Sequence, residues 1–100
     1  MIEKISRTNQ NGKKITIIGL KKSGYSAALL GNQLGATIFV SDLSKDKEVI
    51  NNRDTIIDKG IDCEIGKHTN RIYDTDYWVI SPGVPSDIDI IKKAKEINIP

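Results

Sequence analysis

The segment Lys14-Ile15-Thr16-Ile17-Ile18-Gly19-Leu20-Lys21-Lys22-Ser23-Gly24 joins a strand-like run to a turn that has a glycine at each end. An alanine- and leucine-rich stretch, Tyr25 to Leu34, follows directly. A buried strand, a tight turn that needs glycine and a helix N-terminus with unpaired N–H groups together form a binding site for an anionic ligand. We therefore expect a strand over 14–18, a phosphate-binding turn from Gly19 to Gly24, and a helix over 25–34.

The turn departs from the dinucleotide-binding fingerprint G-x-G-x-x-G at one position, because Lys21 occupies the place of the middle glycine. Lys21 and Lys22 add positive charge beside the expected phosphate site. Ser23 is a residue type that caps helix N-termini, so we expect it to cap the helix that follows. The departure is a first indication of which nucleotide binds.

The rest of the chain alternates strands with helices. Gly35 and Gly60 are expected to end two helices, and Ser86 with Asp89 resembles a capping box for a last one. This alternation predicts right-handed βαβ crossovers and therefore an α/β fold, a Rossmann-like open parallel sheet with helices on both faces. The later strands are expected over 37–40 with Ser41-Asp42 at the tip, over 61–65 and over 77–80, and the later helices over 45–59 and after Ser86.

Composition bounds the class of protein. The chain has 100 residues, of which 38% are hydrophobic, so it can build one small domain. Its 15 basic and 13 acidic residues give a net charge of +2 and are spread along the chain, which argues against a nucleic-acid partner. The single cysteine excludes an intramolecular disulfide, and no apolar run approaches the roughly 20 residues that cross a bilayer. We expect a cytoplasmic, monomeric protein without a membrane partner.

The chain divides into two expected parts. Residues 1–12 are polar and are expected to form a lead-in, and residues 13–100 are expected to form the Rossmann-like domain. The sequence stops at Ile99-Pro100, where a fifth strand would begin, and this stop looks like a truncation.

Three expected strand tips carry residues suited to a nucleotide. The first offers the glycine turn, the second offers Asp42, and the fourth offers the turn Ser81-Pro82-Gly83. Asp42 follows Gly24 at close to the spacing, roughly 20 residues, at which an acidic residue meets a nucleotide's ribose. Because ligands of open parallel sheets lie beyond the carboxyl ends of the strands, one nucleotide can touch all three tips.

These motifs resemble the Mur ligases of peptidoglycan synthesis over residues 13–100. Family members that add L-alanine generally show Ser-Ser-Ala at the second turn, so Ser-Pro-Gly favours the members that add D-glutamate. The full-length family has three domains, and the resemblance implies that this chain is the first, which binds the UDP part of UDP-N-acetylmuramoyl-L-alanine. The resemblance is carried by Ile17 to Gly24, Leu34-Gly35-Ala36, Ser41-Asp42, and Ser81-Pro82-Gly83-Val84-Pro85 followed by Ile90-Ile91-Lys92-Lys93-Ala94.

The resemblance also implies roles for single residues. Lys22 and Ser23 fall where the family's turn meets the diphosphate, and Gly83 would let the second turn pass close to the sugar-phosphate portion. Asp42 falls where the family's acidic strand tip faces the uracil, whose ring N–H a carboxylate can accept. Leu43 and Ser44 would line the base, in place of a Thr-Arg pair in some relatives. The UDP-binding residues expected on this basis are Gly19, Lys21, Lys22, Ser23, Gly24, Asp42, Leu43, Ser44, Ser81, Pro82 and Gly83.

The reaction implied for the complete enzyme is ATP-dependent amide bond formation with D-glutamate, assisted by magnesium. The family's ATP loop, Gly-x-x-Gly-Lys-Thr/Ser in type, does not occur in this sequence. The run Lys21-Lys22-Ser23 is no substitute, because the glycine that precedes the Lys-Ser pair of such a loop is missing. We therefore expect this chain to bind the UDP substrate without catalysing, with no catalytic residue, metal ligand or cofactor of its own.

Two other classes of protein stay open on the sequence alone. An NAD(P)-binding regulatory or dehydrogenase domain has the same fold and a similar first turn, and a non-catalytic interaction module could keep the architecture without binding. His68 is the only histidine and lacks partners for a metal site or a catalytic triad, so we expect a structural or loop role for it. Cys63 and Trp78 are expected to be core residues.

Overall fold

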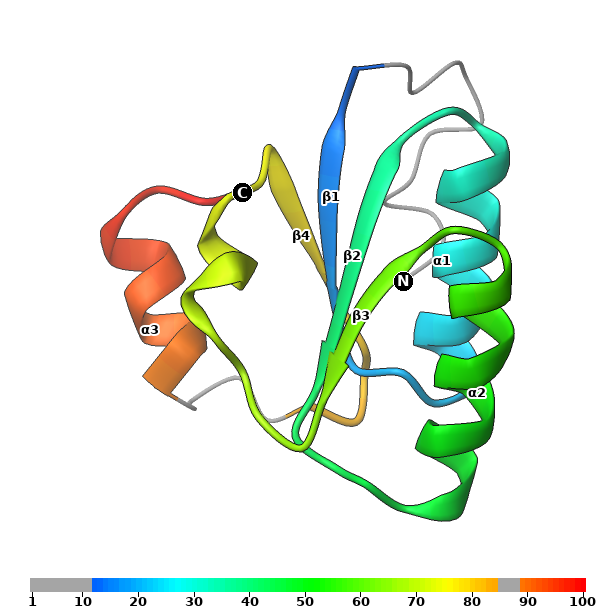
Figure 1. Ribbon diagram of the computed structural model, residues 1–100. Helices are drawn as coiled ribbons and strands as arrows, with labels where there is room; N and C mark the ends of the chain where they lie inside the picture. Colours follow the sequence, from blue (N-terminus) through cyan, green and yellow to red (C-terminus); the bar gives the residue numbers. More distant parts are fainter. Residues whose placement is uncertain (1–11, 85–88) are drawn as a thin grey trace.

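A computed structural model describes residues 12–84 and 89–100 of the chain. These residues form a four-stranded parallel sheet in the order β3-β2-β1-β4, with helices on both faces, which confirms the predicted fold class (Figure 1). The elements in chain order are β1 (Lys14–Ile18), α1 (Lys22–Gln33), β2 (Thr37–Asp42), α2 (Lys47–Asp58), β3 (Asp62–Ile65), the 3-10 helix η2 (Asn70–Tyr73), β4 (Tyr77–Ile80) and α3 (Asp89–Glu96).

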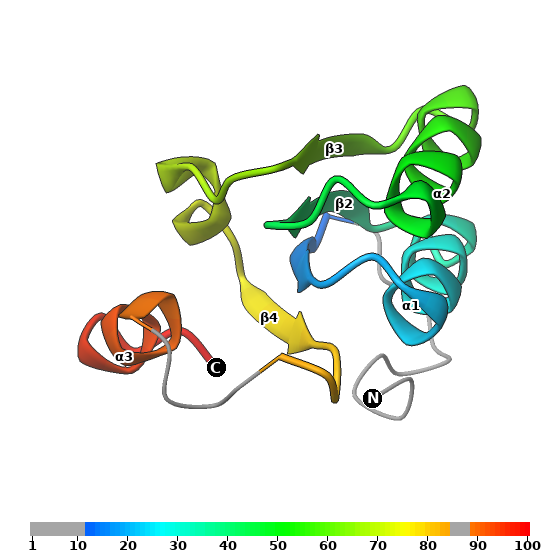
Figure 2. The same cartoon turned by 90° about the horizontal axis from the view of Figure 1, so that it is seen from below.

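Helices α1 and α2 cover one face of the sheet, and η2 and α3 lie on the other (Figure 2). The alternation of side chains along the strands divides the core in the same way. Ile15 and Ile17 of β1 are buried with Ala27 and Ala28 of α1, whereas Ile18 is buried in a second cluster on the α3 face. Both faces of β1 are therefore buried, as expected for an inner strand of a parallel sheet.

Trp78 of β4 is the largest fully buried side chain on the α3 face. Its indole Nε1 donates a hydrogen bond to the Ile72 carbonyl at 2.6 Å, and its ring stacks on Tyr73 with 5.8 Å between centroids. These contacts attach η2 to the sheet and confirm that Trp78 is a core residue.

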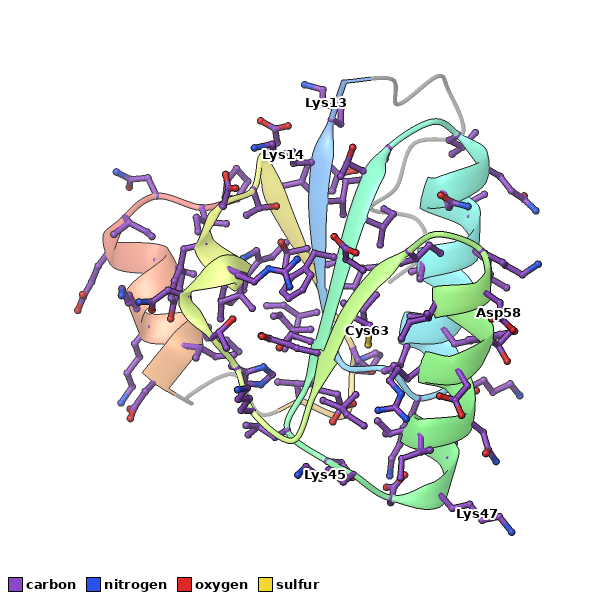
Figure 3. The ribbon with its side chains drawn as sticks, viewed as in Figure 1. Lys13, Lys14, Lys45, Lys47, Asp58 and Cys63 are labelled. Atoms are coloured by element: carbon purple, nitrogen blue, oxygen red, sulfur yellow. The ribbon has the colours of Figure 1, made fainter. Side chains whose placement is uncertain are left out.

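Cys63 lies on β3, on the side of the sheet that faces α2 (Figure 3). It packs against the core cluster below α1 and α2 and is half-buried. Burial raises the pKa of its thiol to about 11, so the group stays protonated at neutral pH. The predicted packing role of Cys63 is thus confirmed.

The structure corrects two predicted helix starts. Helix α1 begins at Lys22 and not at Tyr25, and its N-cap residue is Lys21, which makes no side-chain capping bond. The prediction that Ser23 caps this helix is therefore wrong, because Ser23 already lies in the first helical turn. Helix α2 begins at Lys47, and the side chain of Asp46 caps it by accepting from the Val49 N–H at 3.0 Å.

Several other expectations concern the ends of elements. The capping residue of α1 is Leu34, and Gly35 follows it with a positive φ of 91°. The predicted lead-in over 1–12 falls, apart from Gly12, outside the described residues, and so does Ser86 of the predicted capping box.

The Pro100 carbonyl accepts from the Trp78 N–H at 3.1 Å, so the chain runs beside β4 where a fifth strand was expected. Among the described residues, no helix is both long and apolar enough to cross a membrane.

Candidate functional site

The carboxyl end of β1 lies between the carboxyl ends of β2 and β4. β1 pairs with β2 on one side and with β4 on the other. The strand order therefore reverses direction at β1, which makes the carboxyl end of β1 the topological switch point of the sheet. The Gly19 N–H donates to the Ser41 carbonyl of β2 at 2.9 Å, and the Ser81 N–H donates to the Ile18 carbonyl at 2.9 Å. Open parallel sheets bind ligands at this kind of position. The structure thus brings together the three strand tips that the sequence analysis singled out.

Two glycines make the turn after β1 possible. Gly19 has a positive φ of 104°, and a Cβ placed on it would lie 2.6 Å from the Cβ of Ser81. A Cβ on Gly24 would overlap the Gly19 carbonyl oxygen. The first turn of α1 therefore packs directly on the end of β1, and a larger residue at position 24 would push the two apart, whereas one at position 19 would push against the turn after β4.

Asp42 holds the turn in place from the tip of β2. Its Oδ2 accepts from the Leu20 N–H at 2.7 Å, and its Oδ1 accepts from the Ser44 N–H at 2.8 Å. On the other side of the same turn, the Asn52 side-chain amide of α2 donates to the Leu20 carbonyl at 2.8 Å. The backbone of Leu20 is therefore fixed at both its N–H and its carbonyl, and each oxygen of the Asp42 carboxylate accepts one backbone N–H.

The two lysines of the turn differ in their surroundings. Lys21 forms an ion pair with Asp46, with 3.2 Å between Nζ and Oδ2. The hydrogen bond to Asp46 and the negative charge of that residue raise the pKa of Lys21. Lys22 is exposed, and in the described part of the chain no carboxylate lies within ion-pair distance of it. Of the two lysines, Lys22 can therefore bind an anionic ligand without first breaking an ion pair, whereas Lys21 would have to leave Asp46.

The N-terminus of α1 adds a second source of positive potential. Lys22, Ser23 and Gly24 are the first three helical residues, and the first N–H groups of a helix have no acceptor within it. Lys45 and Lys47 extend from the same end of the molecule, opposite Lys13 and Lys14 (Figure 3).

The turn after β4 is open to solvent. The Val84 N–H donates to the Ser81 carbonyl at 3.0 Å, which closes the turn, and Pro82 and Gly83 are exposed. A Cβ on Gly83 would meet no atom within 4 Å. Packing among the described residues therefore does not require glycine at this position, in contrast to Gly19 and Gly24.

A polar cluster at the tips of β2 and β3 was missed by the sequence analysis. The buried Ser41 hydroxyl lies 2.6 Å from Glu64 Oε2, 2.6 Å from His68 Nδ1 and 3.3 Å from the Lys67 carbonyl. Thr69 donates to the Glu64 carboxylate through its N–H at 2.8 Å and its hydroxyl at 2.6 Å. The expected structural role of His68 is confirmed by these contacts. The only signal in the sequence was the placement of Glu64 and His68 on either side of one strand end.

The charges in this cluster are set by burial and by hydrogen bonds. Burial alone would raise the pKa of Glu64, but the hydrogen bonds from Ser41 and Thr69 outweigh it, and the pKa of Glu64 is lowered. Burial lowers the pKa of His68, although the charges of Glu64 and Asp42 oppose this shift. At neutral pH the cluster therefore holds a carboxylate and a neutral imidazole.

Two of the pockets lined by described residues lie at opposite ends of the sheet. One, of about 330 Å³, lies next to the strand tips and is lined by Leu43, His68, Asp89 and Ile90. The other, of about 220 Å³, lies at the opposite end of the sheet, where Lys14, Thr37 and Asp62 begin their strands. Since that second pocket is far from the glycine turn, it is not part of the site. Within residues 12–84 and 89–100, no group of three or more His, Cys, Asp or Glu residues is placed to hold a metal ion.

A parallel sheet with a glycine turn at its switch point and an acidic residue at the next strand tip is typical of α/β domains of the Rossmann-like class. A family described as the MurD N-terminal domain matches residues 14–90, and the chain belongs to this family. The predicted resemblance to the Mur ligases is confirmed.

Curated relatives support the same assignment. The chain is 38% identical over 89 residues to the UDP-N-acetylmuramoylalanine--D-glutamate ligase of Chloroherpeton thalassium, a match that covers 89% of this chain and 19% of that protein. It is 41% identical over 90 residues to the enzyme of the same name from Chlorobium limicola, with 90% and 19% covered. It is 38% identical over 95 residues to that of Streptococcus pyogenes, with 93% and 21% covered. The chain thus spans about a fifth of the length of these relatives.

Proposed function

We propose that residues 13–100 bind the UDP part of UDP-N-acetylmuramoyl-L-alanine for a ligase that adds D-glutamate during peptidoglycan synthesis. The observation that carries this proposal is the turn from Gly19 to Gly24, which opens α1 beside two other strand tips. The names of the relatives, which are ligases of UDP-N-acetylmuramoylalanine and D-glutamate, support the choice of ligand. The alternative of an NAD(P)-binding domain lacks such support.

The proposed pose follows the charges of the site. The diphosphate lies at the N-terminus of α1, where Lys22, Ser23 and the free N–H groups of the first turn oppose its charge. Lys21 acts mainly through its pair with Asp46, which holds the turn against the start of α2. Glycine at 19 and 24 keeps the backbone close to the phosphates.

The remaining site residues lie on either side of this anchor. Asp42, Leu43 and Ser44 at the tip of β2 lie at the uridine end of the ligand. Ser81, Pro82 and Gly83 form the open turn after β4, which the sugar-phosphate portion can approach closely because Gly83 has no side chain.

The complete protein carries out the reaction in this proposal. ATP, with magnesium, would supply a phosphoryl group to the substrate carboxylate and leave as ADP, and the amine of D-glutamate would then displace phosphate to form the amide, in the cytoplasm and on parts of the protein other than this chain. In this proposal the described residues bind the UDP part of the substrate, and we assign no catalytic step to them.

Parallel calorimetric titrations of the 100-residue chain with UDP, UDP-N-acetylmuramoyl-L-alanine and NAD test the proposal. We expect the two uridine ligands to bind and NAD to bind more weakly or not at all. Preferential binding of NAD would contradict the proposal and favour a dinucleotide-binding domain. Absence of binding by all three ligands would favour a non-catalytic interaction module.

A further inference from the structure

The carbonyl of Leu20 is a buried acceptor that has two donors within reach of the turn. Leu20 is fully buried, so its carbonyl cannot turn to water and needs a donor from the protein. It accepts from the side-chain Nδ2 of Asn52 at 2.8 Å. The other candidate is the Gly24 N–H, because a carbonyl just before a helix ordinarily accepts from the N–H four residues further on. The choice between these two donors decides which groups the start of α1 presents to a ligand.

The Gly24 N–H is left without an acceptor. Helix α1 makes its first backbone bond one residue later, from the Tyr25 N–H to the Lys21 carbonyl at 2.8 Å. Gly24 is buried, and no described residue accepts from its N–H. Buried N–H groups without a partner are rare in folded proteins. The free donor at Gly24 therefore indicates that an acceptor from a ligand belongs at this point.

The hydrogen bond from Asn52 sets the orientation of the whole peptide between Leu20 and Lys21. This peptide is trans, so its carbonyl and its N–H point in opposite directions. With its carbonyl directed at α2, the peptide directs the Lys21 N–H away from α2. Within the described part of the chain, no group accepts from the Lys21 N–H either. The N–H groups of Lys21 and Gly24 are thus both free to donate to an anion.

We infer that Asn52 is a positioning residue for the diphosphate, because it keeps the Leu20 carbonyl away from the N-terminus of α1. Without this hydrogen bond, the carbonyl would accept from the Gly24 N–H and extend α1 by one residue at its start. It would also place a partial negative charge where a phosphate oxygen is proposed to bind. Asn52 acts through the turn and not by contact with the ligand. The inference rests on the proposed function, since it concerns the same diphosphate, and it adds a residue that the sequence had not assigned to the site.

An asparagine is suited to this role, and the chain offers a matched control for it. The amide is a neutral donor, whereas an ionised carboxylate in its place could only accept. Helix α2 is a firm support for the amide, because its N-cap residue Asp46 also pairs with Lys21 of the same turn. The neighbouring Asn51 is exposed on the same helix, and its side chain makes no hydrogen bond to a described residue. Equal substitutions at the two asparagines therefore separate the bond to Leu20 from general effects on α2.

Amide hydrogen exchange measured by NMR tests this role in the 100-residue chain without ligand. In the unaltered chain the Gly24 amide should exchange fast, because no acceptor protects it, and should become protected when UDP binds. In Asn52→Leu, which is similar in size but cannot donate, the Gly24 amide should be protected already in the free chain. Asn51→Leu should behave like the unaltered chain. If Asn52→Leu does not fold, Asn52→Asp keeps the shape without the donor and gives the same test. Equal exchange at Gly24 with and without the Asn52 amide would overturn the inference.

Binding of UDP and of uridine separates a role toward the diphosphate from a role in folding alone. UDP should bind to Asn52→Leu about 10-fold more weakly, since a hydrogen bond to a charged group is lost, while uridine, which has no phosphate, binds as it does to the unaltered chain. Asn52→Gln, which retains an amide donor, should recover part of the UDP affinity. Equal losses for both ligands, or no loss for UDP, would contradict this inference alone. Failure of the unaltered chain to bind UDP would contradict the proposed function, and the exchange of the Gly24 amide in the free chain would still show whether Asn52 controls the Leu20 carbonyl.

Discussion

Gly24 and Gly83 both belong to the candidate site, but only Gly24 is required by the protein's own packing. A Cβ on Gly24 would meet the Gly19 carbonyl oxygen, a backbone atom that cannot move without displacing β1 or α1. We expect Gly24→Ala to lower the free energy of unfolding by an amount at the upper end of the about 1–3 kcal/mol typical of overpacking. Gly83→Ala, which meets no neighbour within 4 Å, is the control and should unfold like the unaltered chain in urea. Equal stability of both variants would contradict the close contact between α1 and β1.

Ser23 lies in the first turn of α1, which makes it a sensitive probe of where the phosphates bind. An acidic residue in a first helical turn is favourable for the helix, so Ser23→Asp should fold normally. The added charge should repel a diphosphate at the helix N-terminus, and UDP should lose affinity about 10-fold or more while uridine loses little. Calorimetry with both ligands measures the difference. An equal loss for UDP and uridine would place the phosphates elsewhere.

Asp42 can be tested for its two possible duties with one substitution. Asp42→Asn leaves a single oxygen for the N–H groups of Leu20 and Ser44, so we expect a loss of about 1–2 kcal/mol in the free energy of unfolding. UDP should bind more weakly, and the preference for UDP over N3-methyl-UDP should fall, because the variant lacks the carboxylate that is proposed to accept the ring N–H of the base. An unchanged preference would remove the Asp42 carboxylate from the recognition of the base.

The sequence allowed these residues to be placed at strand tips, but it did not show what they contact. Gly19, Gly24 and Asp42 were predicted at the site because their positions follow from local patterns of strand and turn. The bond between Ser41 and His68 joins residues 27 positions apart, and it depends on the packing of β2 against β3. Contacts of that kind are set by tertiary structure and leave no local pattern.

Helix α2 starts with an acidic cap that makes its stability depend on pH. The hydrogen bond from the Val49 N–H is the main cause that lowers the pKa of Asp46, and the pair with Lys21 adds to it. A lowered pKa in the folded state stabilises the protein above the unfolded value of 3.8, and this contribution is lost as the pH falls through the folded value. Asp46→Asn retains a capping side chain without the charge, so its unfolding free energy should fall less steeply below about pH 4.

Urea unfolding between pH 3 and pH 7 measures this effect. Glu64, whose pKa is also lowered, should account for part of the slope that remains in Asp46→Asn. Identical slopes in the variant and the unaltered chain would show that Asp46 does not titrate differently in the folded and unfolded states.

Strands were easier to predict than helix starts. The strands over 14–18 and 77–80 were placed correctly, because runs of β-branched and aromatic residues determine both their type and their ends. The start of α1 was placed three residues late, since the prediction treated the turn and the helix as separate segments. Packing of Gly24 on Gly19 merges them, and only the folded backbone shows this.

The order of the strands in the whole sheet follows from the alternation of elements together with one change of direction at β1. Helix α2 joins β2 to β3 on the α1 face, and η2 then leads back across the other face to β4 (Figure 2). The sequence between the strands expected over 61–65 and 77–80 gave no sign of η2. That short helix forms because Trp78 and Ile72 are buried together, which is a property of the complete core.

The double attachment of the Leu20 peptide, by Asp42 on one side and Asn52 on the other, has a kinetic consequence. A loop that is already fixed before the ligand arrives loses little conformational entropy during association. Encounter with a uridine nucleotide should then proceed in one concentration-dependent step, without a slower closing phase. The Leu20 amide should likewise exchange slowly with deuterium in the empty protein, because the hydrogen bond that protects it comes from the fold and not from the ligand.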